Sequence, residues 1–185
     1  MVDTFFLTFS SLFDTITMVW KEIDSNVLIQ RIFLSDPKKK SEQKARDMFK
    51  EINEGSSSLI GTLESKILNF FSGKEEIFDL QSIDFDQCFR VQKEILLAEF
   101  GIPRGWISTY KRISDKVGIP NGARVVGNAL ARNPFPIVIP CHRAIKTNGE
   151  LGGFQGGIEM KRALLEMEGI KFSRKGKVIM DKIHY

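Results

Sequence analysis

The first 34 residues constrain the fold most, because their apolar residues come in short β-rich runs. Phe5–Phe9, Thr15–Trp20 and Val27–Leu34 are rich in Phe, Ile, Val and Thr, and stretches with Ser, Asp and Asn, such as Asp24–Asn26, separate them. β-branched and aromatic residues favour strands, whereas Ser, Asp and Asn favour turns. The pattern predicts three strands in an antiparallel meander.

The apolar spacing changes to a helical period after residue 40. Glu42–Asn53 and Leu59–Phe71 carry apolar residues three and four positions apart, and Ser58 is a candidate N-cap for the second segment. Strands followed by helices predict an α+β fold. We expect an N-terminal α/β structural domain over residues 1–84, followed by a C-terminal, mainly helical domain over residues 85–185.

The second half of the chain contains two predicted helices joined by a short turn. Ser108–Val117 and Asn121–Ala131 have helical spacing, and Gly118–Pro120 lies between them, which is the pattern of a helix-turn-helix. Such pairs also occur in ordinary protein cores. The second helix is unusually rich in Gly and Ala, and a helical glycine costs about 1 kcal/mol relative to alanine. Its composition therefore favours a helix against which another molecule lies closely.

Charge divides the chain in the same way. Residues 86–185 hold 17 Lys and Arg against 9 Asp and Glu, a net charge of +8, whereas residues 1–85 have a net charge of −4. This asymmetry favours one domain that faces a polyanion and one that does not. An unevenly charged surface with no partner is the alternative.

Asn133–Arg143 carries the residues best suited to chemistry. The β-branched run Ile137–Ile139 predicts a short buried strand, and Pro140 makes the chain leave it stiffly at Cys141. A thiol next to the imidazole of His142 suits a sulfur nucleophile, because the imidazole can accept the thiol proton directly or through a water. A cysteine in an apolar setting is also often a small buried hydrophobe.

Several linked motifs resemble the O6-alkylguanine-DNA alkyltransferases, also called methylated-DNA–protein-cysteine methyltransferases. The family's active-site signature resembles Pro140-Cys-His-Arg143. In this chain Asn133-Pro-x-Pro136 precedes that segment, and Gly152-Gly-Phe-Gln-Gly-Gly157 follows it. Other family segments resemble Ile102-Pro-x-Gly105 with Ser108-Thr-Tyr110, Ala123-Arg-Val-Val-Gly127, and Lys161-Arg-x-Leu-Leu-x-x-Glu-Gly169. The resemblance is strong over about residues 91–170. It implies an N-terminal domain with an antiparallel, RNase H-like sheet and a C-terminal domain with a helix-turn-helix.

The resemblance implies irreversible transfer of an alkyl group from O6-alkylguanine, mainly O6-methylguanine, to Cys141. His142 accepts the thiol proton and Glu168 stabilises the resulting imidazolium. Asn133 braces the local turns, and Tyr110 donates a proton to the departing guanine. Each protein molecule is then expected to act once.

The resemblance also assigns residues to DNA and to the base. It implies that the second helix of the pair enters the minor groove and that Arg124 fills the gap left by the flipped base. We expect Ala123, Gly127 and Arg143 to contact DNA as well, and Pro136, Phe154 and Gln155 to line the base pocket. Phe154 stands where the family usually has Tyr, and an aromatic ring remains to pack on the base. Gln155 is bulkier than the small residue often found there, which counts against tolerance of large alkyl groups.

The remaining expectations concern partners, cofactors and location. We find no cofactor motif and expect no cofactor; because residues 1–84 contain no Cys or His, we also expect no metal. No apolar run approaches the roughly 20 residues of a membrane helix, and Asp3 with the lack of a basic start disfavours a signal peptide. We expect a monomer that binds double-stranded DNA and not a membrane, in the cytoplasm, or in the nucleus of a eukaryote. The alternatives are a non-catalytic, alkyltransferase-like lesion-binding protein and a cysteine hydrolase.

Overall fold

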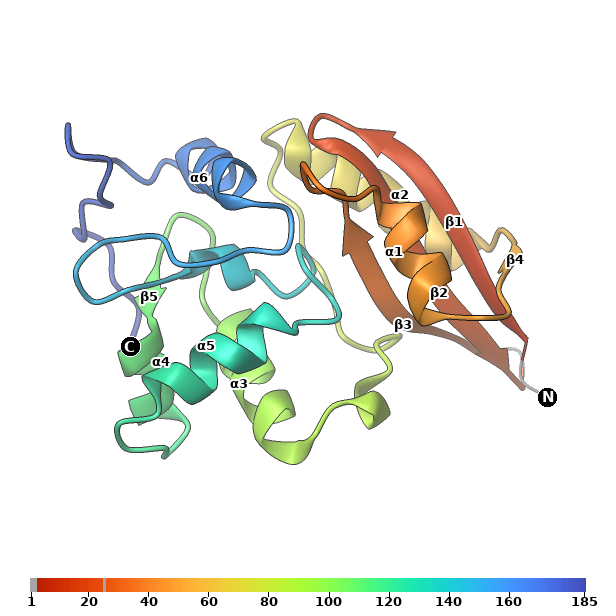
Figure 1. Ribbon diagram of the computed structural model, residues 1–185, viewed down its shortest axis with the longest axis horizontal. Coiled ribbons are helices and arrows are strands. Elements are labelled where there is room, and N and C mark those ends of the chain that lie inside the picture. Colours follow the sequence, from red (N-terminus) through yellow and green to blue (C-terminus); the bar gives the residue numbers. More distant parts are fainter. Residues whose placement is uncertain (1–2, 25) are drawn as a thin grey trace. The chain divides into compact units, whose positions relative to one another are not determined.

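The β-rich runs of the first 34 residues form one sheet in the computed structural model of the protein, which describes residues 3–24 and 26–185 (Figure 1). β1 (Thr4–Ser11), β2 (Asp14–Ile23) and β3 (Asn26–Leu34) are antiparallel neighbours, which confirms the predicted meander. The turn expected at Asp24–Asn26 includes Ser25, which lies outside the described residues.

A fourth strand shows that the helix predicted over Glu42–Asn53 was too long. α1 (Ser41–Met48) ends earlier, and the two-residue β4 (Asn53–Glu54) pairs in parallel with β1, so the sheet is not wholly antiparallel. The helix ends because Phe49 turns to an extended backbone and packs its ring 6.3 Å from that of Phe33. This packing on the sheet outweighs the local helical period.

Two helices cover the two faces of the sheet. α1 lies on the face that carries Phe6, Val19 and Phe33. Trp20 and Ile29 are paired neighbours on the other face of the sheet. α2 (Ser58–Phe71) lies on that face, where it lines a cavity together with Ile29. The N-cap of α2 is Ser57 and not Ser58, which is the first helical residue.

The chain forms two compact units, each described here by itself. Unit 1 contains the residues up to Gln87 together with Pro134–Val138, and unit 2 contains Cys88–Asn133 and Ile139–Tyr185. The chain therefore enters unit 1 a second time just before Cys141. Within unit 1 this segment is held by a hydrogen bond from the Ile32 amide to the Pro134 carbonyl (2.8 Å) and by ring packing of Phe135 on Phe85.

The strand predicted over Ile137–Ile139 is wrong, although all three residues are buried. They form a turn, and Ile137 has a φ of +75°. A β-branched residue in the left-handed region costs roughly 1–3 kcal/mol and persists only where the surrounding structure enforces it. The strain lies four residues before Cys141.

Unit 2 is mainly helical. Its named elements are α3 (Arg90–Phe100), β5 (Ser108–Thr109), α4 (Tyr110–Lys116), α5 (Ala123–Ala131), η2 (Cys141–Arg143), β6 (Ala144–Ile145) and α6 (Ile158–Met167), while the short η1 (Phe85–Gln87) ends unit 1. α4 and α5 pack against each other and are joined by the turn around Gly118, whose φ is +71°. The fold is thus α+β, with a sheet-containing unit and a mainly helical unit.

Thr109, and not Ser108, caps α4. The Thr109 hydroxyl accepts from the Arg112 amide at 3.2 Å, whereas Ser108 lies in β5 and donates its hydroxyl to the His184 carbonyl. Val91, at the start of α3, is 43% exposed.

The core of unit 2 joins residues that are far apart in the sequence: Ile107, Ile145, Leu151, Leu165, Ile170 and Val178. These residues hold the loop before α6 and the segment after it against the β5–β6 ribbon. Among residues 3–24 and 26–185, no helix has both the length and the apolar character needed to cross a bilayer.

Candidate active site

The backbone aims Cys141 through two successive tight turns. Pro140 (φ −79°, ψ 57°) is the centre of an inverse γ-turn in which the Cys141 amide donates to the Ile139 carbonyl at 2.8 Å. The next turn is η2, closed by the Arg143 amide on the Pro140 carbonyl. The Asn133 side-chain amide donates to the same Ile139 carbonyl at 3.0 Å, so Asn133 braces the approach to the cysteine.

The thiol of Cys141 is 5% exposed and is protonated in the free protein at neutral pH. Burial raises the pKa of the Cys141 thiol to about 12, although a hydrogen bond from Asn133 lowers it. The sequence suggests a thiol that its neighbours activate. In the free protein, burial instead keeps the thiol protonated.

His142 and Arg143 converge on one carboxylate. His142 Nε2 lies 2.9 Å from Glu168 Oε1, and the Arg143 guanidinium binds both carboxylate oxygens, with Nη2 at 2.7 Å from Oε1 and Nε at 2.9 Å from Oε2. Arg143 also donates to the Ile102 carbonyl at 2.6 Å. The side chains of His142 and Glu168 are both fully buried.

The end of α6 fixes the position of Glu168. Glu168 is the C-cap, and Gly169 follows with a φ of +83°. The Ile170 amide donates to the Leu165 carbonyl and the Gly169 amide to the Glu166 carbonyl, which together form a Schellman motif. The glycine is required there because left-handed backbone is costly for other residues.

The charges of this cluster determine which nitrogen of His142 carries a proton. Burial alone would raise the pKa of the Glu168 carboxyl, but His142 and Arg143 outweigh it and lower the pKa to about 2. Burial lowers the pKa of His142 in spite of Glu168, so the imidazole is neutral at pH 7 and Arg143 balances the carboxylate. Because a carboxylate can only accept, Nε2 carries the hydrogen and Nδ1 is the nitrogen that can take up a proton.

A buried lysine stands on the other side of the site. Lys161 is 0% exposed, and its ammonium donates to the Ala144 carbonyl at 2.7 Å and the Gly153 carbonyl at 3.3 Å. It also lies 3.5 Å from the Tyr110 hydroxyl. Burial lowers the pKa of Lys161 to about 8 and raises that of Tyr110, so both groups keep their protons at neutral pH.

A cavity of about 210 Å³ in unit 2 reaches the thiol. Cys141, Tyr110 and Phe154 line it together with Gly127, Leu130, Ala131, Lys146, Gly152 and Gly153. Phe154, which is expected at the base pocket, thus lines the cavity at Cys141, and its ring centroid is 6.2 Å from that of His142. Gln155 does not line this cavity, and Pro136 belongs to the segment assigned to unit 1.

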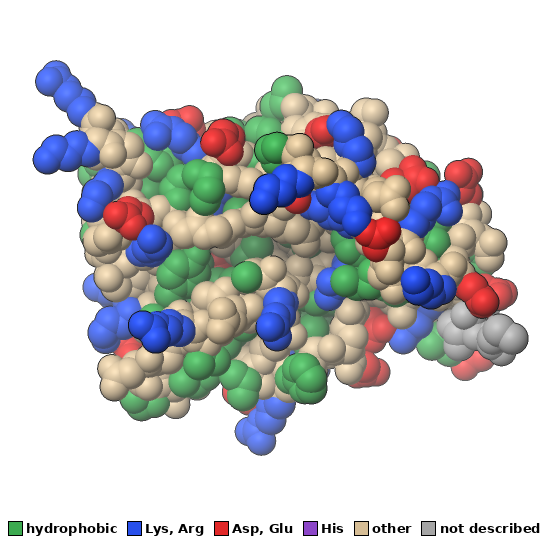
Figure 2. Space-filling model, viewed as in Figure 1, with side chains coloured by type: hydrophobic (Ala, Val, Ile, Leu, Met, Phe, Trp, Pro, Cys, Tyr) green, Lys and Arg blue, Asp and Glu red, His purple; other side chains and the backbone are tan. Residues whose placement is uncertain are grey.

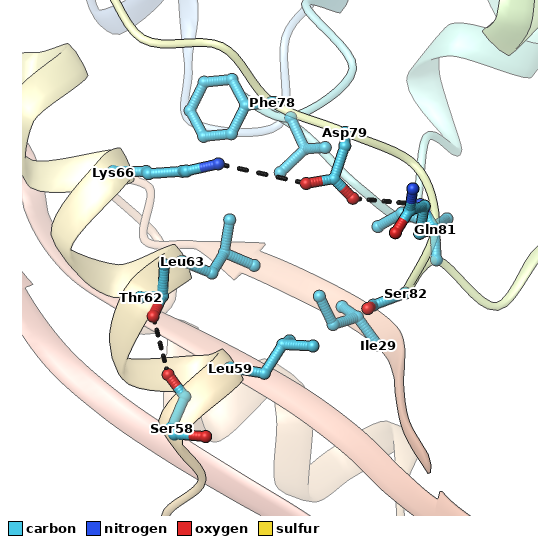
Figure 3. Close-up of a pocket in the computed structure, with 12 residues that line it drawn as sticks. Ile29, Ser58, Leu59, Thr62, Leu63, Lys66, Phe78, Asp79, Gln81 and Ser82 are labelled. Atoms are coloured by element: carbon cyan, nitrogen blue, oxygen red, sulfur yellow. Dashed lines mark hydrogen bonds and ion pairs between the residues drawn. The ribbon is translucent and has the colours of Figure 1, made fainter.

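A second cavity lies within unit 1 and is larger, at about 330 Å³. Figure 3 shows Ile29, Leu59 and Leu63 pointing into it, with Lys66 and Asp79 at its rim, 4.0 Å apart. Its lining contains neither a thiol nor an imidazole. The candidate active site is therefore the smaller cavity at Cys141.

α5 presents the residues expected at DNA. Arg124 is exposed, and a Cβ added at Gly127 would meet nothing within 4 Å, so no contact inside the described protein requires glycine there. Arg143 does not fit its expected role as a DNA contact. It is 9% exposed and its guanidinium is engaged by Glu168 and Ile102, which corrects that prediction.

The motifs of the sequence assign no role to Lys161 or Glu99, although the sequence carries a signal in both cases. Glu99 lies four residues after Ile95 on the apolar face of α3, and Lys161 lies three and four residues before Leu164 and Leu165. A charged residue at a core position of a helix marks a buried polar group that needs a reason.

Gly152 leaves room for the Tyr110 side chain because it has no side chain of its own. It has a φ of +72°, and a Cβ there would lie 2.4 Å from the Tyr110 hydroxyl. We expect Gly152→Ala to destabilise the protein by roughly 1–3 kcal/mol, from backbone strain and the clash together. Gly153→Ala is the control, since its Cβ would meet nothing within 4 Å, and it should change stability by less than about 0.5 kcal/mol. Urea unfolding of both variants measures the difference, and equal stabilities would contradict the contact.

Comparisons with known proteins agree with this geometry. Residues 90–170 match the family described as 6-O-methylguanine DNA methyltransferase, DNA binding domain. A methylated-DNA–protein-cysteine methyltransferase of Methanothermobacter thermautotrophicus is 44% identical over 111 residues, which are 60% of this chain and 62% of that protein. The Mycobacterium bovis protein of the same name is 45% identical over 103 residues, 54% of this chain and 59% of the relative. The chain thus spans about three fifths of the length of the curated relatives it matches.

Similarity to solved structures extends over most of the chain. A Mycobacterium tuberculosis OGT crystallised in complex with DNA superposes with a TM-score of 0.72 at 29% identity, covering 89% of this chain and 92% of that one. The O6-methylguanine-DNA methyltransferase of Pyrococcus kodakaraensis shares the fold, with a TM-score of 0.66 at 22% identity and coverage of 90% and 99%. Most of the matched residues lie in unit 2, which holds the Cys141 thiol, the His142–Glu168 pair and α5 with Gly127. Residues 90–170 therefore match the DNA-binding domain of the 6-O-methylguanine DNA methyltransferase family, and the chain is similar to methylated-DNA–protein-cysteine methyltransferases.

Proposed function

We propose that this protein repairs DNA by taking O6-alkylguanine, mainly O6-methylguanine, out of the duplex and transferring the alkyl group to its own Cys141. The observation that carries the proposal is a buried thiol at a cavity that also presents a phenol and adjoins a buried His–Glu pair. The thioether product is stable, so the reaction is expected to occur once per molecule. In this proposal residues 85–185 bind DNA and accept the alkyl group, and residues 1–84 are structural.

The transfer step is an in-line displacement at the alkyl carbon. The Cys141 thiol gives its proton to His142, directly or through a water, and Glu168 stabilises the imidazolium. The thiolate sulfur then forms a bond to the alkyl carbon while the bond from that carbon to guanine O6 breaks. Tyr110 donates its hydroxyl proton to the departing guanine, and Lys161, 3.5 Å away, stabilises the phenolate that forms.

The buried position of the Cys141 thiol determines how the protein must bind its target base in DNA. A base stacked in a duplex cannot reach Cys141, so the target must be flipped into the cavity. α5 suits the minor groove, because Gly127 leaves its surface open and the exposed Arg124 can occupy the vacated position, with Ala123 beside it. Figure 2 shows Lys and Arg side chains over the α4–α5 region and the C-terminal segment, where they can contact phosphates.

Arg124→Ala should slow repair of duplex DNA by at least about tenfold, but should change the reaction with free O6-benzylguanine by less than about twofold. A free base needs no flipping, and a planar guanidinium that pairs with the orphaned base is worth roughly 1–3 kcal/mol. Arg124→Lys, which keeps the charge but loses the planar group, should fall between the two. Single-turnover rates on both substrates measure this, and equal losses would place Arg124 in the pocket or the fold.

Labelled methyl transfer tests the proposal as a whole. A duplex with one labelled O6-methylguanine should lose its label to the protein, with a plateau at one methyl per protein molecule. Lesion binding without transfer would favour the non-catalytic alternative. Repeated turnover on an ester or peptide would favour a cysteine hydrolase.

We further propose that the protein acts as a monomer on double-stranded DNA, with neither cofactor nor metal, in the cytoplasm, or in the nucleus of a eukaryotic cell. The steps above need only side chains of this chain and the alkylated base. Light scattering with and without DNA would test the monomer, and a dimer in either state would contradict it.

A further inference from the structure

A carboxyl group lies on the buried face of α3. The residues buried there are Ile95, Leu96 and Glu99, and Glu99 is 0% exposed. Neither carboxyl oxygen of Glu99 has a hydrogen-bond partner in the part of the chain that the structure describes. Buried polar groups are nearly always paired, and leaving one unpaired costs free energy. Such a group needs an explanation.

Glu99 lies among the groups of the candidate active site. α3 packs against η2, α4 and α5. The charged and titratable groups that interact with Glu99 are Arg143 and Cys141 of η2, Tyr110 of α4, Lys161 of α6 and the C-terminal Tyr185. The Lys161 ammonium is held by the carbonyls of Ala144 and Gly153 and not by Glu99.

Glu99 and Lys161 act on Cys141 in opposite directions. Burial raises the pKa of the Glu99 carboxyl to about 8, and Lys161 and Arg143 offset this only in part, so the carboxyl is mainly neutral at pH 7. An ionised Glu99 raises the pKa of the Cys141 thiol, whereas the Lys161 ammonium lowers it. The field at the thiol therefore depends on whether Glu99 carries a proton.

We propose that Glu99 is a positioning residue that controls the ionisation of Cys141 through the balance of its charge with that of Lys161. While the Glu99 carboxyl is protonated, the Lys161 ammonium favours the thiolate. When the carboxyl ionises, its negative charge opposes formation of the thiolate, and Lys161, whose pKa is also about 8, loses its supporting charge over the same pH range. This refines the proposed alkyl transfer and rests on it for its biological meaning, but the effect on the thiol is a property of the free protein.

The test is the rate at which iodoacetamide alkylates Cys141 in the free protein between about pH 6 and pH 10, followed by peptide mass. Glu99→Gln removes the ionisable group at nearly the same volume. The ratio of the variant's rate to that of the wild type should rise from about one at pH 6 to roughly ten at pH 9.5, because a nearby like charge shifts a pKa by about one unit or more. Cys88 in the same samples is the internal reference.

Glu94→Gln is the matched control, since Glu94 lies on the exposed side of the same helix and pairs with the 91% exposed Arg90. Its profile should overlay that of the wild type. A Glu99→Gln ratio that is the same at every pH would show a structural role only and overturn the inference. If Glu99→Gln fails to fold, Glu99→Leu provides the same comparison.

The same variants are then reacted with a duplex containing O6-methylguanine. A pH-dependent ratio with iodoacetamide, combined with no methyl transfer by any variant, would uphold the control of the thiol and refute the proposed function. Methyl transfer combined with an iodoacetamide rate ratio that is the same at every pH would uphold the proposed function and refute the control of the thiol by Glu99.

Discussion

Replacing Cys141 by serine should abolish methyl transfer, lowering the single-turnover rate by at least about a thousandfold. A hydroxyl is a far weaker nucleophile than a thiolate, and the burial that already raises the pKa of the thiol acts on the hydroxyl as well. The serine fits the same turn, because Pro140 and the Asn133 hydrogen bond set the backbone. We therefore expect the variant to keep its affinity for duplex containing O6-methylguanine.

Cys88→Ser is the control for the Cys141 variant. Cys88 is the other cysteine of the chain, is only partly buried, and lies outside the cavity. This variant should transfer methyl at the wild-type rate. Loss of transfer in Cys88→Ser, or retention in Cys141→Ser, would contradict the assignment of the nucleophile.

Glu168→Gln should destabilise the protein by about 3 kcal/mol at neutral pH and lower its melting temperature by roughly 10 °C. The change leaves the buried Arg143 guanidinium without a counter-charge, a loss that typically costs about 3–5 kcal/mol. The lowering of the Glu168 pKa from 4.5 to about 2 indicates a similar value, at about 1.4 kcal/mol per unit. A chain of this length loses about 2–4 °C per kcal/mol.

The difference in unfolding free energy between the wild type and Glu168→Gln should depend on pH, in the direction set by the lowered pKa of Glu168. A carboxyl whose pKa is depressed by folding contributes stability that is fully present above pH 4.5 and is lost as the pH falls toward 2. The unfolding free energies of wild type and Glu168→Gln should therefore differ most above pH 5 and converge in acid. Glu166→Gln is the control, because its pair with Arg162 is about half exposed and is worth less than about 1 kcal/mol. Parallel curves at all pH values would show that the carboxylate charge is not the cause.

The sequence predicted the elements whose local pattern agrees with the tertiary packing. The three-stranded meander and the α4–α5 pair fall within a few residues of their expected positions, since their apolar periods match the faces they bury. The pattern failed where distant contacts decide the backbone. Phe49 leaves α1 to reach Phe33, and Ile137 turns although its composition favours a strand.

The residues of the candidate site also divide into those that a local motif identifies and those that only the fold brings together. Cys141, His142 and Glu168 could be named because their motifs are linear, and the structure brings His142 and Glu168 to 2.9 Å from each other. Arg143 could not be placed from its sequence, because only the fold shows that Glu168 binds it in the interior. Lys161 and Glu99 come from two helices that are distant in the sequence, so no local pattern links them.

Peptide mass after reaction with duplex DNA containing O6-methylguanine tests the central claim most directly. We expect one added methyl group per protein molecule, carried by the peptide that contains Cys141, in a one-to-one ratio with repaired lesions. The peptide that contains Cys88 should stay unmodified. A methyl on Cys88, or loss of the lesion with no methyl on the protein, would contradict the account.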